Sequence, residues 1–369
     1  MTSTPEQTVD ARPPGDEDDD DRGLEFTARS VLTLCGFLAA IFLGLYLLLP
    51  QLAGLEDTWR RIEDGSPAWI VLALLLTLGM FGGYVEMFRG VFSKAAKGII
   101  GRTESFLITM AGLAASRIFA AGGAGGLVLQ AWALRQAGLA KRVVADKTIS
   151  FLVLTYFPYA AAVVICGIGL RIGLFPGEAP LPMTVVPAII AAIMMGLCCL
   201  ILLVPTDLQR RLDGFAKRTG VLGRLAQRLA SAPAATSAGL HDALSHLRSR
   251  DPALLGAIAF WGFQIAVLWA AFRAFGDAPP TAVLVQAFFV GMLGNLLPIP
   301  GGVGGVEGGM IGAFAAFGVD AGLAVVAVLV FRALTFWLPL VPGVIAFFRL
   351  RARVEEWRRE RGATIQSKA

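Results

Sequence analysis

Two charged residues lie inside strongly apolar parts of this chain. Glu307 stands near the end of the stretch GNLLPIPGGVGGVEGG, residues 294–309, and Arg332 lies about 11 residues into the apolar stretch 321–348. A single charge in hydrocarbon is costly, so both side chains should face an interior cavity. There they could form a structural salt bridge, or one of them could bind a charged substrate group or carry a proton. Both interpretations stay open from the sequence.

Arg117 is the candidate for an anion-binding residue in the first half of the chain. It precedes a glycine-rich run at 122–126, Gln130 follows that run, and Asn295 lies in the second glycine-rich stretch. A guanidinium group can bind phosphate oxygens through two parallel hydrogen bonds, so Arg117 and Arg332 are predicted to hold an anionic phosphate. The predicted substrate-binding residues are Glu307, Arg332, Arg117, Asn295 and Gln130.

Glycine and proline interrupt both stretches. Proline lacks a backbone donor and glycine weakens a helix, so neither stretch can be one continuous helix. In a bilayer, the unpaired backbone groups must be packed inside protein or line a wet cavity. Helices that begin after Gly126 and Gly305 would aim their N–H groups at an anion. The residues predicted to form the breaks are Gly122, Gly123, Gly125, Gly126, Pro298, Pro300, Gly301, Gly302, Gly304 and Gly305.

The composition indicates a membrane protein. Hydrophobic residues make up 56% of the 369 residues, 16% are charged, and the mean hydropathy is +0.68. We predict an all-α polytopic membrane protein with about six full transmembrane helices and two glycine-broken re-entrant helical hairpins. The hairpins are expected at 104–140 and 281–318, and the spans at 31–49, 68–91, 149–170, 185–204, 253–275 and 321–348.

The two halves of the chain show the same order of segments. The glycine runs at 122–126 and 301–305 are 179 residues apart, and each half reads span, span, hairpin, span. We predict an inverted-topology repeat with its halves at 30–172 and 183–350, because oppositely inserted repeats can expose one midplane site to either side. Chance recurrence of a glycine-rich pentapeptide is the alternative.

Basic clusters predict the orientation in the membrane. Lys and Arg are concentrated at 89–102, 141–147, 206–250 and 349–368. The positive-inside rule makes these regions and both termini cytoplasmic, in a bacterial-type plasma membrane. Residues 1–29, with the run DEDDDD, should be a disordered acidic tail, and 351–369 a basic tail. The insert 206–251 has apolar residues at helical spacing, and should lie on the membrane surface or pack on the protein's cytoplasmic face.

Metal, cofactor and catalytic sites are not expected. The four cysteines lie in apolar segments without ligand partners, and the only histidines are His241 and His246. No constellation of His, Asp and Ser suggests an enzyme. We therefore predict no metal and no cofactor.

The motifs carry a resemblance to a known family. The segments LLPIPGGVGGVEGG and FRALTFWLPLVPG, together with ASRIFAAGG in the first half, resemble the lysylphosphatidylglycerol synthase transmembrane-region family. The similarity covers about residues 30–350 and is strongest at 298–307 and at Arg332. That family includes the flippase part of bacterial multiple peptide resistance factors, so the resemblance implies a translocase for a charged lipid. Ala120 and Ala121 depart from its pattern, which has proline and glycine after the arginine.

We therefore predict a lipid translocase that moves a charged phospholipid or glycolipid headgroup through a cavity between the two hairpins. The expected partners are membrane lipids, anionic or aminoacylated phospholipids among them, and not nucleic acid. We expect no aminoacyl-transferase domain, because the chain ends at Ala369, and a separate enzyme would then make the lipid. A homo-oligomer stays open. The alternatives are a proton- or ion-coupled carrier of a small hydrophilic solute, with Glu307 titrating, and a membrane enzyme of lipid or polyprenyl-glycan metabolism.

Overall fold

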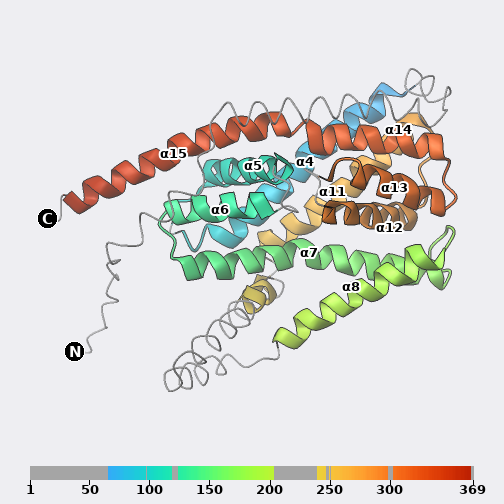
Figure 1. Ribbon diagram of the computed structural model, residues 1–369, viewed down its shortest axis with the longest axis horizontal. Coiled ribbons are helices and arrows are strands. Elements are labelled where there is room, and N and C mark those ends of the chain that lie inside the picture. The colour runs from blue at the N-terminus through green and yellow to red at the C-terminus, as the bar shows by residue number, and fades with distance from the viewer. Residues whose placement is uncertain are drawn as a thin grey trace. The chain divides into compact units, whose positions relative to one another are not determined.

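The computed structural model describes residues 65–96, 98–118, 124–202, 239–246, 249, 251–297 and 302–366. Every regular element in these ranges is a helix (Figure 1). The predicted span at 31–49, the acidic tail, and the break residues Gly122, Gly123, Pro298, Pro300 and Gly301 lie outside the described residues.

Five helical stretches in the described part are long and apolar enough to cross a membrane. They are α4 (Pro67–Phe92), α7 (Lys141–Arg171), α8 (Leu181–Leu202), α11 (Pro252–Phe275), and the run of α14 (Ala321–Arg332), η3 (Ala333–Trp337) and α15 (Leu340–Gln366). Each coincides with a predicted span, and apolar side chains such as Leu75, Ile190 and Leu255 are exposed on their outer faces, where lipid tails would lie. The predicted all-α polytopic membrane fold is confirmed.

Both glycine-broken segments fold into pairs of short helices, and neither is an unbroken rod. In the first pair, α5 (Arg102–Ile118) packs on α6 (Ala124–Gln136). In the second, α12 (Thr281–Met292) and the single 3-10 turn η1 (Leu293–Leu296) pack on α13 (Gly305–Ala316) (Figure 1). The membrane side from which each pair enters stays a prediction.

Glycines let the helices of each pair approach backbone to backbone. A Cβ atom on Gly126 would lie 2.4 Å from the carbonyl oxygen of Gly112, and one on Gly294 would lie 2.3 Å from the carbonyl group of Gly305. No carbon atom is tolerated at such distances. These contacts therefore require glycine for space, independently of its conformational freedom.

The described break residues have different roles. Gly125 and Gly126 lie in the first turn of α6. Gly302 and Gly304 precede α13 with φ angles of +63° and +85°, in the left-handed region that favours glycine. Gly305 is the first residue of α13.

The last apolar segment changes its hydrogen-bonding pattern between α14 and α15. Within the π-helix η3 the Leu338 amide donates to the Ala333 carbonyl at 2.9 Å. Pro339 has no N–H, so the Thr335 carbonyl four residues earlier lacks its ordinary helical donor. This carbonyl is available to a donor from elsewhere in the fold.

Helix α15 continues into the segment predicted to be a basic tail and packs on α5. The buried apolar residues of this extension are Leu350, Val354 and Trp357. Arg353 Nη2 also lies 3.3 Å from Glu104 Oε1 at the start of α5. The basic segment is therefore helical to Gln366 and docks on the protein through residues as far along as Trp357, and its cytoplasmic position stays a prediction.

A short helix at 239–246 belongs to the predicted insert. Its residues Leu240 and Ala243 are buried, and Gly239 lies directly against Ile149 of α7. For this part of the insert, the structure shows packing on the protein, which was one of the two alternatives.

The helix boundaries agree with the predicted offset between the halves. Adding 179 to the first residues of α5, α6 and α7 gives 281, 303 and 320, whereas α12, α13 and α14 begin at 281, 305 and 321. The opposite insertion of the two halves stays a prediction.

Candidate functional site

The two buried charges singled out in the sequence bind each other. Arg332 Nε donates to Glu307 Oε1 at 2.7 Å and joins the end of α14 to the first turn of α13. The two side chains are only 7% and 3% exposed. In such a poorly solvated place each charge compensates the desolvation of the other. The predicted pairing is present.

The second oxygen of Glu307 caps a helix. Oε2 accepts a hydrogen bond at 2.8 Å from the Gly304 amide, just before α13, where a carboxylate also interacts favourably with the helix dipole. Both carboxylate oxygens are therefore engaged by the protein. Glu307 holds α13 and Arg332 in place.

Arg117 binds the backbone of the last segment. Its Nη2 donates to the Thr335 carbonyl at 2.8 Å and its Nη1 to the Phe336 carbonyl at 2.9 Å. The first of these is the carbonyl that Pro339 leaves without a helical donor. A guanidinium group has five N–H donors, so two such bonds leave three for another acceptor.

The Phe336 ring contacts both guanidinium groups. Its centroid lies 5.1 Å from Cζ of Arg117 and 4.2 Å from Cζ of Arg332. Attraction between a cation and the ring face stabilises both arginines and offsets part of their mutual repulsion.

One cavity of about 360 Å³ brings four of the five predicted residues together. Arg117, Gln130, Asn295 and Arg332 line it, while Glu307 supports Arg332 from outside the lining. The lining comes from helices of both predicted repeats, and the volume lies within the range of small-molecule sites, roughly 300–1,000 Å³. Of the break residues, Gly126 and Gly302 also line the cavity.

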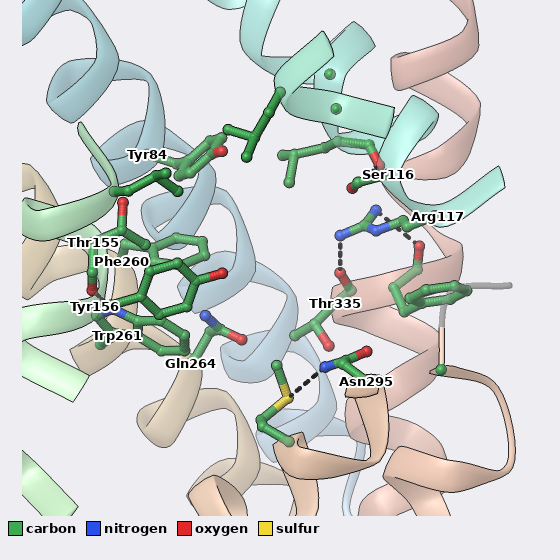
Figure 2. Close-up of a pocket in the computed structure, with 18 of the residues that line it drawn as sticks. Tyr84, Ser116, Arg117, Thr155, Tyr156, Phe260, Trp261, Gln264, Asn295 and Thr335 are labelled. Carbon is green, nitrogen blue, oxygen red and sulfur yellow. Dashed lines mark hydrogen bonds between the residues drawn. The ribbon is translucent and has the colours of Figure 1, made fainter. Parts of the chain in front are cut away.

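The cavity has two sides of different chemistry, as Figure 2 shows. The aromatic side consists of Tyr84, Tyr156, Phe260, Trp261 and Gln264, and the arginine side of Ser116, Arg117, Asn295 and Thr335. The described lining includes two arginines and no carboxylate. It therefore suits an anion on one side and a neutral, partly polar group on the other.

The aromatic side was missed in the sequence. Tyr84, Tyr156 and Trp261 lie in apolar segments that contain other aromatic residues, and no spacing distinguishes them from core residues. Gln264 is the residue on this side that the sequence could have indicated. An amide in the middle of an apolar span is costly unless it serves a polar site.

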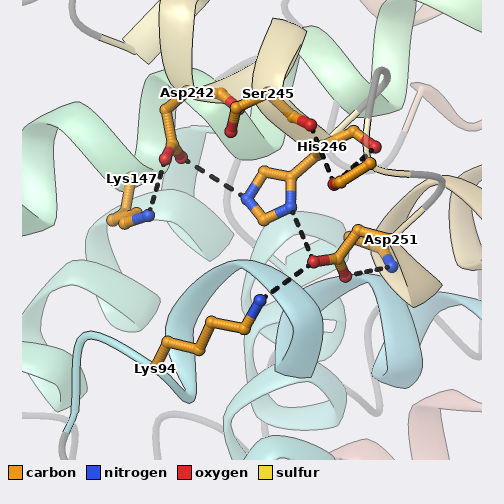
Figure 3. Close-up of polar contacts among 8 residues, drawn as sticks. Lys94, Lys147, Asp242, Ser245, His246 and Asp251 are labelled. Atoms are coloured by element: carbon orange, nitrogen blue, oxygen red, sulfur yellow. Dashed lines mark hydrogen bonds and ion pairs between the residues drawn. The ribbon is translucent and has the colours of Figure 1, made fainter.

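A second polar cluster, the histidine cluster, shares no residue with the cavity lining (Figure 3). His246 Nδ1 lies 3.3 Å from Asp251 Oδ2, and its Nε2 lies 3.6 Å from Asp242 Oδ2. Lys94 Nζ binds Asp251 at 3.1 Å and Lys147 Nζ binds Asp242 at 2.8 Å. These alternating charges tie the helix at 239–246 to α7 and to the segment that joins α4 to α5.

The histidine cluster favours protonated His246. Asp242, whose Oδ2 lies 3.6 Å from Nε2, raises the pKa of His246, burial opposes this, and the charge of Asp251 adds to the rise. Burial raises the pKa of Asp242, but the neighbouring His246 and the hydrogen bond from the Lys147 ammonium group outweigh burial and hold that pKa well below its usual range. Asp242 therefore stays ionised throughout the range in which His246 titrates.

We expect the substitution His246→Asn to destabilise the protein more at about pH 6 than at about pH 8.5. A raised pKa in the folded state means that the histidine contributes fully below its ordinary value near 6.5, and that the contribution is lost as the pH rises through the raised pKa. The measurement is the thermal unfolding midpoint in detergent at both pH values. His241→Asn, at an exposed position, is the control. An equal loss at both pH values would contradict the charged role of His246.

Long apolar helices and two broken helical pairs around an internal cavity define a multi-pass membrane protein. The model of the family "Lysylphosphatidylglycerol synthase TM region" matches residues 32–343, so the chain belongs to this family, and the resemblance seen in the sequence is confirmed.

Curated relatives include UPF0104 membrane proteins of Methanothermobacter thermautotrophicus. One match is 23% identical over 328 residues and covers 82% of this chain and 90% of the relative. Two local matches are 35% identical over 91 residues and 31% identical over 108 residues. They cover 24% and 29% of this chain, and 26% and 32% of the relative's length.

Proposed function

We propose that this protein moves lipids with a phosphate-containing, anionic headgroup between the two leaflets of a membrane. The headgroup enters the cavity while the acyl chains stay in the bilayer. Desolvation of the charged headgroup is the main barrier to unassisted crossing, and a polar cavity inside the protein lowers it. The family description, which names a lysylphosphatidylglycerol synthase, supports a lipid as substrate.

The observation that carries the proposal is the charge balance around the cavity. Glu307 neutralises Arg332, whereas Arg117 binds only backbone carbonyls and the Phe336 ring among the described residues. One positive charge is therefore left for a ligand. The first turn of α6, which lines the cavity at Gly126, adds the positive end of a helix dipole on the same side.

Access from the bilayer is supported by Tyr156. This residue of the membrane-spanning helix α7 lines the cavity and is nevertheless 54% exposed. An opening of the cavity beside α7 would let a lipid keep its acyl chains outside while its headgroup is inside.

The solute-carrier alternative has less support. It needs Glu307 to titrate, and both oxygens of that carboxylate are engaged by Arg332 and the Gly304 amide. The enzyme alternative has no supporting observation in the described residues.

Reconstitution of the purified full-length protein into liposomes tests the proposal. The probe is phosphatidylglycerol with a fluorescent acyl chain, and the readout is the rate at which the label becomes accessible to a membrane-impermeant quencher. We expect wild-type protein to accelerate crossing and Arg117→Gln to lower the initial rate about tenfold or more, which corresponds to the loss of about 1.4 kcal/mol. Uptake of a water-soluble solute without lipid movement would favour the carrier instead.

Two further variants isolate the charge of Arg117. Arg117→Lys keeps the charge but loses the forked geometry, so we expect an intermediate rate. Arg171→Gln makes the same change at an exposed end of α7 and should leave the rate unaltered. Equal rates for wild type and Arg117→Gln would exclude Arg117 as the anion site.

A further inference from the structure

We infer that the headgroup consists of a phosphate joined to a sugar ring, with the phosphate at the arginine side of the cavity and the ring at the aromatic side. This inference rests on the proposed function and adds the class of substrate.

The arginine side offers donors but no matching carboxylate. Arg117 lines the cavity on this side (Figure 2) and has three N–H groups beyond those that bind Thr335 and Phe336. A phosphate group accepts several such bonds at once, and charge-assisted bonds of this kind are the strong ones. The phosphate therefore belongs at this side.

The aromatic side offers an amide without a partner. Gln264 lines the cavity, is 7% exposed, and makes no hydrogen bond to any residue that the structure describes. In Figure 2 its amide and the Tyr156 hydroxyl both point into the cavity. A buried amide is costly unless a ligand or water satisfies it, and an amide beside a phenol can both donate to and accept from neighbouring hydroxyl groups.

Packed aromatic rings surround this amide. The Phe260 centroid lies 4.9 Å from that of Tyr84 and 5.0 Å from that of Trp261, whose Nε1 donates to the Thr155 carbonyl at 2.6 Å. The rings are thus fixed before any ligand arrives. The C–H groups of a sugar ring carry slight positive charge and pack against the negative faces of aromatic rings, while its hydroxyls reach polar groups at the edge.

The charges disfavour an aminoacyl headgroup. A lysyl group would bring two ammonium groups into a cavity whose described lining has two arginines and no carboxylate. Glu307 does not supply the missing charge, because its oxygens are bound to Arg332 and Gly304. A glycerol headgroup avoids the repulsion but lacks a ring to cover the aromatic surface.

The experiment compares phosphatidylglucose, phosphatidylglycerol and lysylphosphatidylglycerol with identical acyl chains. Binding to the full-length protein is measured in detergent by thermal stabilisation, and translocation is measured in liposomes. Glucose 1-phosphate is the water-soluble arm. We expect phosphatidylglucose to bind about tenfold more tightly than phosphatidylglycerol, and lysylphosphatidylglycerol to bind most weakly. Stronger binding of glucose 1-phosphate than of the lipid would show that the site serves a soluble sugar phosphate, and would overturn the lipid substrate.

Two variants test the placement of the ring. Gln264→Leu and Tyr156→Phe should each weaken phosphatidylglucose binding roughly five- to tenfold and so reduce its preference over phosphatidylglycerol. Tyr159→Phe is the matched control, because that hydroxyl donates to the Phe289 carbonyl at 3.0 Å and the residue is not in the cavity lining. The Tyr159→Phe variant should keep the preference for phosphatidylglucose over phosphatidylglycerol.

Failure of this inference differs from failure of the proposed function. Equal binding of the glucose and glycerol lipids, or tightest binding of the lysyl lipid, would overturn the sugar class even if all three cross the membrane. If no lipid crosses but the glucose lipid binds with the expected preference and Gln264→Leu removes that preference, the sugar site stands and the translocase does not.

Discussion

Replacing Arg332 with methionine should lower the free energy of unfolding by about 3–5 kcal/mol. The change leaves the Glu307 carboxylate buried beside an apolar side chain, and the cost is that of an uncompensated charge. Glu307→Gln should cost a similar amount because it leaves the guanidinium of Arg332 uncompensated. These are the largest stability effects expected from any side-chain substitution near the cavity.

The double variant Glu307→Gln/Arg332→Met separates the charge pair from the helix cap. Glutamine at 307 can still accept the Gly304 hydrogen bond, so the cap is kept while the ion pair and the contact of Arg332 with the Phe336 ring are removed. We expect the double variant to be more stable than either single variant, because two neutral groups leave no buried charge. Unfolding curves in mixed detergent, measured for all four proteins, give the coupling free energy.

Arg353→Met is the control for this cycle. Arg353 also pairs with a glutamate, Glu104, but its side chain is 40% exposed. Exposed pairs contribute between zero and about 1 kcal/mol, so little change is expected. A coupling near zero between positions 307 and 332 would show that the pair does not stabilise the fold.

Alanine at Gly294 should be the second severe substitution. Its Cβ would lie 2.3 Å from the carbonyl group of Gly305, so η1 and α13 must move apart. Overpacking of this kind costs about 1–3 kcal/mol, and more where backbone rather than side chain must yield. Because Asn295 and Gly302 belong to the same junction and line the cavity, lipid binding should weaken together with stability.

Gly312→Ala is the matched control for this substitution. Gly312 lies within α13, and no atom lies within 4 Å of an added Cβ beyond its own helix. Alanine there should leave stability unaltered or raise it by up to about 1 kcal/mol, because alanine favours the helix. Equal effects at 294 and 312 would mean that the close approach in the second hairpin is not required.

The spans and breaks could be predicted because they depend on local chemistry. Asp251 caps α11 through the Ala253 amide at 3.2 Å, and Asp320 caps α14 through the Leu323 amide at 2.9 Å, so aspartate before an apolar run marks a helix start. The burial of Glu307 and Arg332 followed from the cost of isolated charge in hydrocarbon. The sequence left their pairing as one of several interpretations. In the structure Arg332 Nε lies 2.7 Å from Glu307 Oε1.

The remainder of the site depends on packing that no local pattern reports. Helix α7 begins at Lys141, about eight residues before the predicted span, because hydropathy marks the bilayer and not the end of a helix. The packing of neighbouring helices decides which face of an apolar helix faces the cavity. The sequence therefore could not distinguish Tyr156 and Gln264 from lipid-facing or core residues. The hydrogen bond from Arg117 to the Thr335 carbonyl depends on a π-helix at 333–337. The presence of Pro339 alone did not predict that π-helix.

The docking of α15 on α5 gives the end of the chain an influence over the cavity. Residues Leu350, Val354 and Trp357 press on the first hairpin, and α5 carries Ser116 and Arg117 into the cavity. A displacement of α15 would therefore shift α5 and, with it, Arg117. A partner bound to this helix would thus act on the cavity without entering it.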